Sequence, residues 1–269
     1  MDVSLAGNVL DTFDAERLAS LLEPVDVSLS PEQVRQLARY GELLHERNAV
    51  TNLTAVRDVE GVEKRLLLES VRLVPAIRNT PPIDTVGRRT LLDVGTGGGL
   101  PGMVLAICFP DITTYLLDAT GKKIAFLDDV VADLELPNVH TIHGRAEEIG
   151  HQPRYRNAFD LVTARAVSSI SALLELGLPM LRTGGTMLLP KGVEIEEELD
   201  AGNRAAEMLN GEIISADLLP DVGSTIETRL VVVRKKGSTP GKYPRRSGIP
   251  ARDPLGTRPV GRKQHGRTP

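Results

Sequence analysis

The chain has 269 residues, of which 41% are hydrophobic and 25% charged, as in an ordinary globular domain with appendages. No apolar run approaches the roughly 18 residues that a membrane span needs, and the first residues do not resemble a signal peptide, so we expect a cytoplasmic protein without a membrane anchor. The single cysteine, Cys108, excludes an internal disulfide framework and a cysteine zinc site, and the spacing of the five histidines predicts no metal.

The net charge of −4 averages an acidic body and a basic C-terminal end. From Arg234 to Pro269 there are eleven basic residues and one acidic residue, whereas the preceding part has 21 basic and 35 acidic residues. Residues 237–269 form a basic, Gly/Pro-rich tail that we expect to be largely disordered, because it cannot bury enough apolar surface to offset its ordering entropy. This tail is either simply solvated or an arm that binds a polyanion, for which RNA is the first candidate.

Residues 1–80 have the pattern of an N-terminal helical segment. Ser30-Pro31-Glu32 supplies an N-cap, a first-turn proline and an acidic residue, and Val34, Leu37 and Leu44 recur at helical spacing. A Pro/Gly stretch at 75–87 separates this segment from a second domain that we expect to span residues 88–236. We expect the helical segment to pack on that domain.

From Thr90 onward, short apolar runs alternate with stretches of helix-forming length. The runs are TLLDV, TTYLL, NVHTI, FDLVTA, GTMLLP, GEIISA and TRLVVV. The first five predict a parallel sheet made of βαβ units. The last two are joined without an obvious helix and predict an antiparallel hairpin at the sheet edge. We therefore expect an α/β fold with a seven-stranded, mostly parallel sheet.

A glycine-rich turn, GTGGGLPG, connects the first predicted strand to a helix that begins near Leu100-Pro101. Glycines let the backbone approach a ligand without a Cβ clash, and a helix N-terminus offers free N–H groups to an anion. The acid-x-G-x-G-x-G frame of methyltransferases is matched by Asp93, Gly95, Gly97 and Gly99. In that frame the anion is the carboxylate of S-adenosylmethionine. The G-x-G-x-x-G spacing of dinucleotide enzymes is matched as well, by Gly97, Gly99 and Gly102.

Polar residues at the ends of the next strands extend this candidate site. Asp118 ends the run TTYLLD, where its carboxylate is placed to accept both ribose hydroxyls of an adenosine or to cap the helix expected at 121–134. The backbone at Ala146-Glu147, after NVHTI, is placed to pair with an adenine edge, although Glu147 also fits as a first-turn helix acid. Arg165 follows FDLVTA, where methyltransferases place substrate-proximal residues; the alternative is an ordinary salt bridge.

Three lysines near the same strand ends have alternative interpretations. Lys191, which ends the fifth strand, fits either an RNA phosphate contact or plain solvation. Lys122-Lys123 begin the helix beside Asp118 and are expected to lie on a solvated face.

Five sequence runs occur in the order and spacing of one known family. The runs LLDVGTGGGLPG, GKKIAFL, GRAEE, FDLVTARAV and LRTGGTMLLPKG together resemble the RsmG (GidB) family, the bacterial small-subunit rRNA guanine-N7 methyltransferases. Asn52-Leu53-Thr54 and Tyr243-Pro244-Arg245 match further elements of the family, so the resemblance covers roughly residues 30–255. The chain departs from the family at Arg65 and at Glu69-Ser70, where His and Asp-Ser are usual, on a surface expected to face RNA.

The resemblance implies a Rossmann-like class I methyltransferase fold with S-adenosylmethionine as the cofactor. It also implies that the substrate is N7 of a guanine in 16S rRNA of the small ribosomal subunit, in the decoding-centre loop (position 527). The family's cofactor contacts carry over to Gly95, Leu100, Ala146, Glu147 and Arg165. With the residues derived above, the expected cofactor-binding set is Gly95, Gly97, Leu100, Asp118, Ala146, Glu147 and Arg165.

Arg165 is also the candidate catalytic residue, and no metal is expected to take part. We expect a monomer, because no apolar surface stretch stands out. Two other functions stay open. One is a dinucleotide-dependent oxidoreductase, for which the chain lacks a Tyr-x-x-x-Lys proton donor. The other is a non-catalytic RNA-binding or assembly factor of the small subunit.

Overall fold

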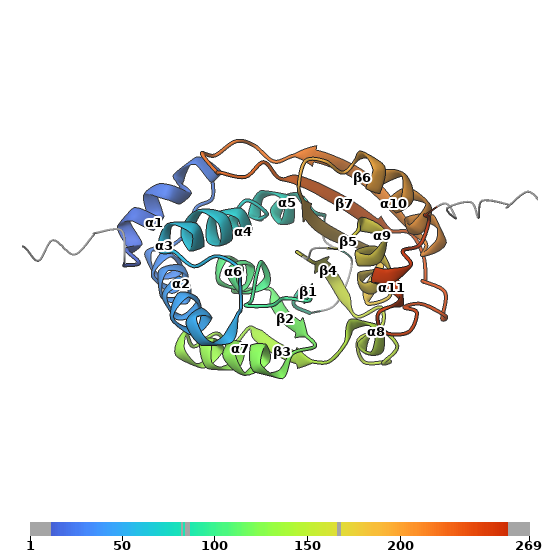
Figure 1. Cartoon of the computed structure of the whole chain (residues 1–269), viewed down its shortest axis with the longest axis horizontal. Coiled ribbons are helices and arrows are strands. Elements are labelled where there is room, and N and C mark those ends of the chain that lie inside the picture. The colour runs from blue at the N-terminus through green and yellow to red at the C-terminus, as the bar shows by residue number, and fades with distance from the viewer. Residues whose placement is uncertain (1–11, 82, 84–86, 166–167, 258–269) are drawn as a thin grey trace, which may run out of the picture.

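The computed structural model describes residues 12–81, 83, 87–165 and 168–257, which are arranged around one seven-stranded sheet (Figure 1). The strands are β1 (Thr90–Val94), β2 (Thr113–Asp118), β3 (Val139–His143), β4 (Phe159–Thr163), β5 (Leu181–Lys191), β6 (Gly211–Leu218) and β7 (Arg229–Lys235). They lie in the order β3-β2-β1-β4-β5-β7-β6. Strands β1 to β5 pair in parallel, and β7 pairs antiparallel with both β5 and β6. The predicted mostly parallel sheet with a terminal hairpin, as in class I methyltransferases, is confirmed.

Helices cover both faces of this sheet. One face packs against α6 (Gly102–Cys108) and α7 (Gly121–Asp133), in a core that also contains the apolar residues of the N-terminal helices. The other face packs against α8 (Ala146–Ile149), α9 (Ile170–Gly177) and α10 (Glu196–Met208). Within the part of the chain that the structure describes, no helix combines the length and apolar character needed to cross a membrane.

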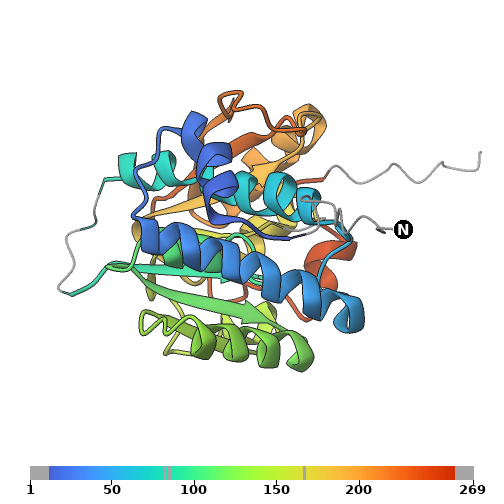
Figure 2. The ribbon, with the colours of Figure 1, turned by 90° about the vertical axis from the view of Figure 1, so that its left-hand side faces the viewer.

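The N-terminal helices form a further layer outside α6 and α7. They are α1 (Ala15–Leu22), a 3₁₀ turn at Glu23–Val25, α2 (Pro31–Thr51), α3 (Val59–Gly61), a π-helix at Val62–Leu68, α4 (Glu69–Val71) and α5 (Val74–Asn79). Figure 2 shows the long helix α2 running alongside the sheet. Leu37 and Leu44 of α2 share one buried core with Ile107 of α6 and Leu127 of α7. The N-terminal helices are therefore part of the core of the domain on which they pack.

Helix α2 begins where the sequence pattern predicts. The Ser30 hydroxyl accepts a hydrogen bond from the Gln33 backbone N–H at 3.2 Å, and the Gln33 side chain accepts one from the Ser30 N–H at 2.8 Å. This reciprocal capping box satisfies two of the N–H groups that a helix start leaves without partners. The Gln33 amide also donates to the backbone oxygen of Ile107 at 2.8 Å, which fixes the start of α2 against the end of α6.

The C-terminal residues up to 257 correct the expectation of a largely disordered tail. After β7 the chain continues through α11 (Ile249–Arg252), with Tyr243 and Leu255 buried in the same core as α9. The prediction of disorder rested on the low content of apolar residues. It did not take into account specific hydrogen bonds and ion pairs between this segment and distant parts of the chain. The part of that prediction that concerns residues 258–269 lies outside the described residues.

Candidate functional site

The glycine-rich turn after β1 forms a tight loop that we call the Gly loop, residues 95–99. Gly95, Gly97 and Gly99 all have positive φ angles, of +69°, +62° and +105°, which L side chains rarely adopt. At Gly99 a Cβ atom would also lie only 2.9 Å from the Tyr40 hydroxyl. Glycine at this position is therefore required both by the backbone conformation and by the close approach of α2.

Asp93, at the end of β1, is hydrogen-bonded to the Gly loop and to the first residue of α6. One of its carboxylate oxygens accepts hydrogen bonds from the Thr96 hydroxyl at 2.6 Å and from the Gly102 backbone N–H at 2.8 Å. Asp93 is fully buried, and burial raises the pKa of its carboxyl to about 6, although both hydrogen bonds act in the opposite direction. The sequence predicted that the start of α6 offers free N–H groups to an anion. The Gly102 N–H is instead bonded to Asp93 and is not available.

Most of the loop amides are likewise already bonded within the protein. Gly95 and Thr96 donate to the backbone oxygen of Leu117, and Gly99 donates to the backbone oxygen of Thr96. For Gly98, the structure records no acceptor among the described residues. Gly98 therefore offers a donor to a ligand.

Asp118, at the end of β2, links the Gly loop to the next turn. Its carboxylate accepts from the Gly97 N–H at 2.9 Å and from the Thr120 N–H at 2.8 Å, and it lies 3.8 Å from the Lys123 ammonium. The residue that caps α7 is Thr120, so Asp118 is not its N-cap. This arrangement brings the carboxyl ends of β1 and β2 together, as the sequence predicts.

A cavity of about 710 Å³ lies over the Gly loop, at the carboxyl ends of β1, β4 and β5. Predicted site residues that line it are Gly95, Gly97, Leu100 and Arg165. Other parts of its wall come from the loop at 53–56, from the segment that contains the π-helix, from Lys123 of α7, from the end of β5, and from residues just before β7. The predicted residues Asp118, Ala146 and Glu147 do not line this cavity.

Arg165 enters the cavity wall from the end of β4. Its guanidinium donates to the Ser70 hydroxyl at 3.4 Å and forms no ion pair with any described residue, which argues against an ordinary salt bridge. Burial lowers the pKa of this guanidinium, and the nearby carboxylates of Asp93 and Glu69 partly oppose the shift. With respect to the described residues, most of the five N–H donors of Arg165 are thus available to an acceptor in the cavity.

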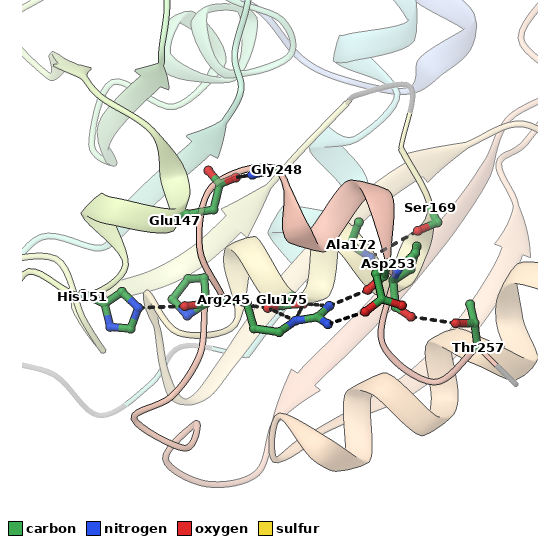
Figure 3. A network of polar contacts seen from close by, with 11 residues as sticks. Glu147, His151, Ser169, Ala172, Glu175, Arg245, Gly248, Asp253 and Thr257 are labelled. Atoms are coloured by element: carbon green, nitrogen blue, oxygen red, sulfur yellow. Dashed lines mark hydrogen bonds and ion pairs between the residues drawn. The ribbon is translucent and has the colours of Figure 1, made fainter. Parts of the chain in front are cut away.

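Ala146 and Glu147 begin α8, farther along the same edge of the sheet. The turn before them is joined to β2 by a hydrogen bond from the Gly144 N–H to the Asp118 backbone oxygen, at 3.0 Å. Glu147 is in the first turn of α8, and one oxygen of its carboxylate accepts from the Gly248 N–H at 2.8 Å (Figure 3). Ala146 and Glu147 are therefore placed beside Asp118, outside the cavity over the Gly loop.

Two of the three lysines, Lys191 and Lys123, are less exposed than a solvated position would be. Lys191 donates to the Ser168 backbone oxygen at 2.7 Å and pairs with Glu198 at 3.0 Å, with its side chain only 10% exposed. Plain solvation therefore does not describe Lys191, which also lines the cavity, and a contact with an RNA phosphate stays a prediction. Lys122 is exposed, as expected, whereas Lys123 is half-buried at the cavity.

Residues of the N-terminal helices also belong to the site, and the motifs and spacing of the sequence did not indicate Tyr40 or Glu69 as members. The buried Tyr40 hydroxyl donates to the Gly98 backbone oxygen at 2.7 Å. Glu69 lines the cavity and accepts hydrogen bonds from Arg72, Ser224 and Thr228. Glu69 therefore lies buried in the cavity wall, and Ser70 is buried next to it, in place of the exposed position that the sequence suggested. Arg65 is exposed and also lines the cavity.

The described residues contain no cluster of three or more His, Cys, Asp or Glu side chains arranged to hold a metal ion. The site instead combines a constrained loop, one half-buried arginine and a row of strand ends. Its chemistry is that of binding a polar small molecule along one edge of the sheet.

Known proteins resemble this chain over most of its length. Residues 33–220 match the family model described as GidB, rRNA small subunit methyltransferase G. The chain is 39% identical to the ribosomal RNA small subunit methyltransferase G of Lactobacillus delbrueckii subsp. bulgaricus, over 90% of this chain and 100% of that protein. It is 37% identical to the protein of that name from Exiguobacterium sibiricum, over 91% of this chain and 100% of that protein. With the protein of that name from Moorella thermoacetica, the identity is 38% over 90% and 99% of the two chains.

Proposed function

Because the chain belongs to the rRNA small subunit methyltransferase G (GidB) family, we propose that it transfers the methyl group of S-adenosylmethionine to N7 of a guanine in 16S rRNA. The observation that carries the proposal is the cavity over the Gly loop. The half-buried guanidinium of Arg165 lies in its wall and forms no ion pair with a described residue. From the family resemblance we propose the decoding-centre loop of the small ribosomal subunit as the target.

The residues of the site fit this cofactor in size and in donor chemistry. The cavity over the Gly loop, about 710 Å³, is within the usual range for small-molecule sites and would take the methionine end of the cofactor. The adenosine would lie outside this cavity, beside Asp118 and the start of α8. The Gly98 amide is suited to the methionine carboxylate, the Asp118 carboxylate to the ribose hydroxyls, and the start of α8 at Ala146 and Glu147 to the adenine edge. When bound, the cofactor supplies a methyl group already activated by its sulfonium.

The chemistry of the acceptor explains why the site needs no general base. Guanine N7 has an in-plane lone pair and no proton, so nothing has to be removed before it attacks the methyl group. The described lining of the cavity accordingly contains no histidine or cysteine. Holding N7 in line with the S–CH₃ bond is the main task of the protein, and such positioning supplies about 7–11 kcal/mol.

We propose Arg165 as the residue that performs much of this positioning. Its available N–H donors lie at the cavity, where the acceptors of the reaction, a cofactor carboxylate and the guanine O6, come together. Replacing Arg165 by alanine is expected to lower the methylation rate about a hundredfold, the cost of a misplaced reactant. Arg35→Ala is the matched control, because Arg35 is exposed on α2 and pairs with Glu32 on the same helix.

The test is methyl transfer from labelled S-adenosylmethionine to small subunits that lack the modification, combined with calorimetric binding of the cofactor. Full activity of the Arg165→Ala protein would exclude the role proposed for this residue. Binding of a nicotinamide cofactor in place of S-adenosylmethionine would favour the oxidoreductase alternative. Binding of small-subunit RNA without any methyl transfer would favour the non-catalytic factor.

A further inference from the structure

The C-terminal segment, residues 239–257, is fixed by polar contacts to α9 and to the turn after α8. The carboxylate of Glu175 in α9 accepts hydrogen bonds from the backbone N–H of Arg245 at 2.7 Å and from its guanidinium at 2.7 Å (Figure 3). Glu175 is completely buried, so this pair is a strong and specific anchor. On the other side, His151 is hydrogen-bonded to the Pro244 backbone oxygen at 2.7 Å.

A further contact joins this segment to the site proposed above. Gly248, three residues after the Arg245 anchor, has a φ angle of +78° and directs its N–H at the carboxylate of Glu147, at 2.8 Å. This bond engages one carboxylate oxygen, Oε1. The structure records no hydrogen bond from a described residue to the other oxygen, Oε2.

The position of Glu147 gives this contact a functional meaning. The turn before α8 is hydrogen-bonded to Asp118 through Gly144. Glu147 therefore follows Asp118, the residue suited to the ribose, along the carboxyl edge of the sheet. The 6-amino group of adenine is a hydrogen-bond donor, and a carboxylate oxygen is a strong acceptor for it. A glutamate side chain at the surface has several rotamers, however, and it binds such a donor well only when one of them is fixed.

We propose that the backbone amide of Gly248 is a positioning group for the cofactor, which fixes the Glu147 carboxylate so that its second oxygen accepts from the 6-amino group of the adenine. The inference rests on the proposed function, since it assumes that the adenosine lies along this edge. The C-terminal segment then contributes to cofactor recognition without touching the cofactor.

Replacement of Gly248 by alanine tests this inference with a minimal change. No atom of the described residues lies within 4 Å of a Cβ placed there, so the substitution acts through the φ angle of +78°, which is strained for alanine, and shifts the amide. Gly184→Ala is the matched control: its φ angle is +81°, its Cβ position is equally open, and it lies near the opposite end of β5. Gly248→Asn is the rescue variant, because asparagine tolerates a positive φ.

The measurement is calorimetric binding of two probes to the full chain. One is S-adenosylhomocysteine, and the other is its analogue with hydrogen in place of the 6-amino group. For the unmodified protein we expect a preference of about tenfold for the amino form, as one hydrogen bond to a charged group provides. The preference should fall to about twofold or less in Gly248→Ala and should persist in Gly184→Ala and Gly248→Asn. Glu147→Ala should abolish it with or without the Gly248 change.

These outcomes separate the inference from the proposed function. An unmodified protein that fails to bind S-adenosylhomocysteine would refute the proposed cofactor. A preference that is present and unchanged in Gly248→Ala would overturn the role of the Gly248 amide alone. A preference that increases in Gly248→Ala would also overturn it, because Gly248 would then compete with the adenine for the carboxylate. A general loss of stability would lower the affinity for both probes equally and leave the ratio of the two affinities unchanged. That result would likewise contradict the role of this amide.

Discussion

The packing of the C-terminal segment makes a quantitative prediction about the Arg245–Glu175 pair. Glu175 is 0% exposed and Arg245 is 25% exposed, so replacing Arg245 by methionine leaves a buried carboxylate without its guanidinium. Breaking one side of such a buried pair costs about 3–5 kcal/mol. The Arg245 backbone N–H still donates to Glu175 in the variant. We therefore expect the lower end of that range, about 3 kcal/mol of unfolding free energy.

The assay is urea unfolding of the full chain. The dependence of the unfolding free energy on urea concentration should be the same for the unmodified protein and the variants. The double variant Arg245→Met/Glu175→Leu should recover to within about 1 kcal/mol of the unmodified protein, because an apolar pair replaces the buried charges. Arg252→Met is the surface control, expected to change stability by about 0.5 kcal/mol or less. If Arg245→Met lowered the unfolding free energy no more than this control does, the packing of the C-terminal segment on α9 would be refuted.

Two further predictions concern charge. The raised pKa of Asp93, about 6 against about 4 in the unfolded chain, means that the folded state binds more protons between these values. The contribution of Asp93 to the unfolding free energy is therefore largest below pH 4 and is lost as the pH rises through 6. Relative to an Asp93→Asn variant, the unfolding free energy of the protein should fall by about 3 kcal/mol over this range. A difference between the two proteins that does not change with pH would contradict the effect of burial. Removing residues 258–269, which contain four basic residues, should make the log–log salt slope of RNA binding shallower by about 3. An unchanged slope would exclude these residues from RNA binding.

The sheet and the Gly loop were predictable from the sequence because their signals are local. Apolar runs alternate with helix-length stretches, and Gly95, Gly97 and Gly99 each occupy a positive φ that the spacing anticipates. The capping box at Ser30 is similarly contained within four residues. Each of these features is determined by neighbouring residues, so one sequence is enough to predict it.

The rest of the site depends on contacts between distant segments. Tyr40 approaches Gly98 across 58 positions, and Arg245 pairs with Glu175 across 70. Nothing in the spacing around these residues indicates their partners. For the same reason a basic, Gly/Pro-rich composition predicted disorder for residues that pack against α9. The roles of Ala146 and Glu147 in binding the cofactor stay predictions, which the proposed binding experiments address.

Mapping the methyl group on the RNA is the decisive test of the proposed function. Small subunits that lack the modification are incubated with the protein and labelled S-adenosylmethionine, and reduction followed by aniline cleavage locates any N7-methylguanine. We predict label at a single guanine of the decoding-centre loop, at a rate that falls about a hundredfold in Arg165→Ala. Absence of label on subunits and on naked RNA, with the cofactor shown to bind, would contradict the proposed function.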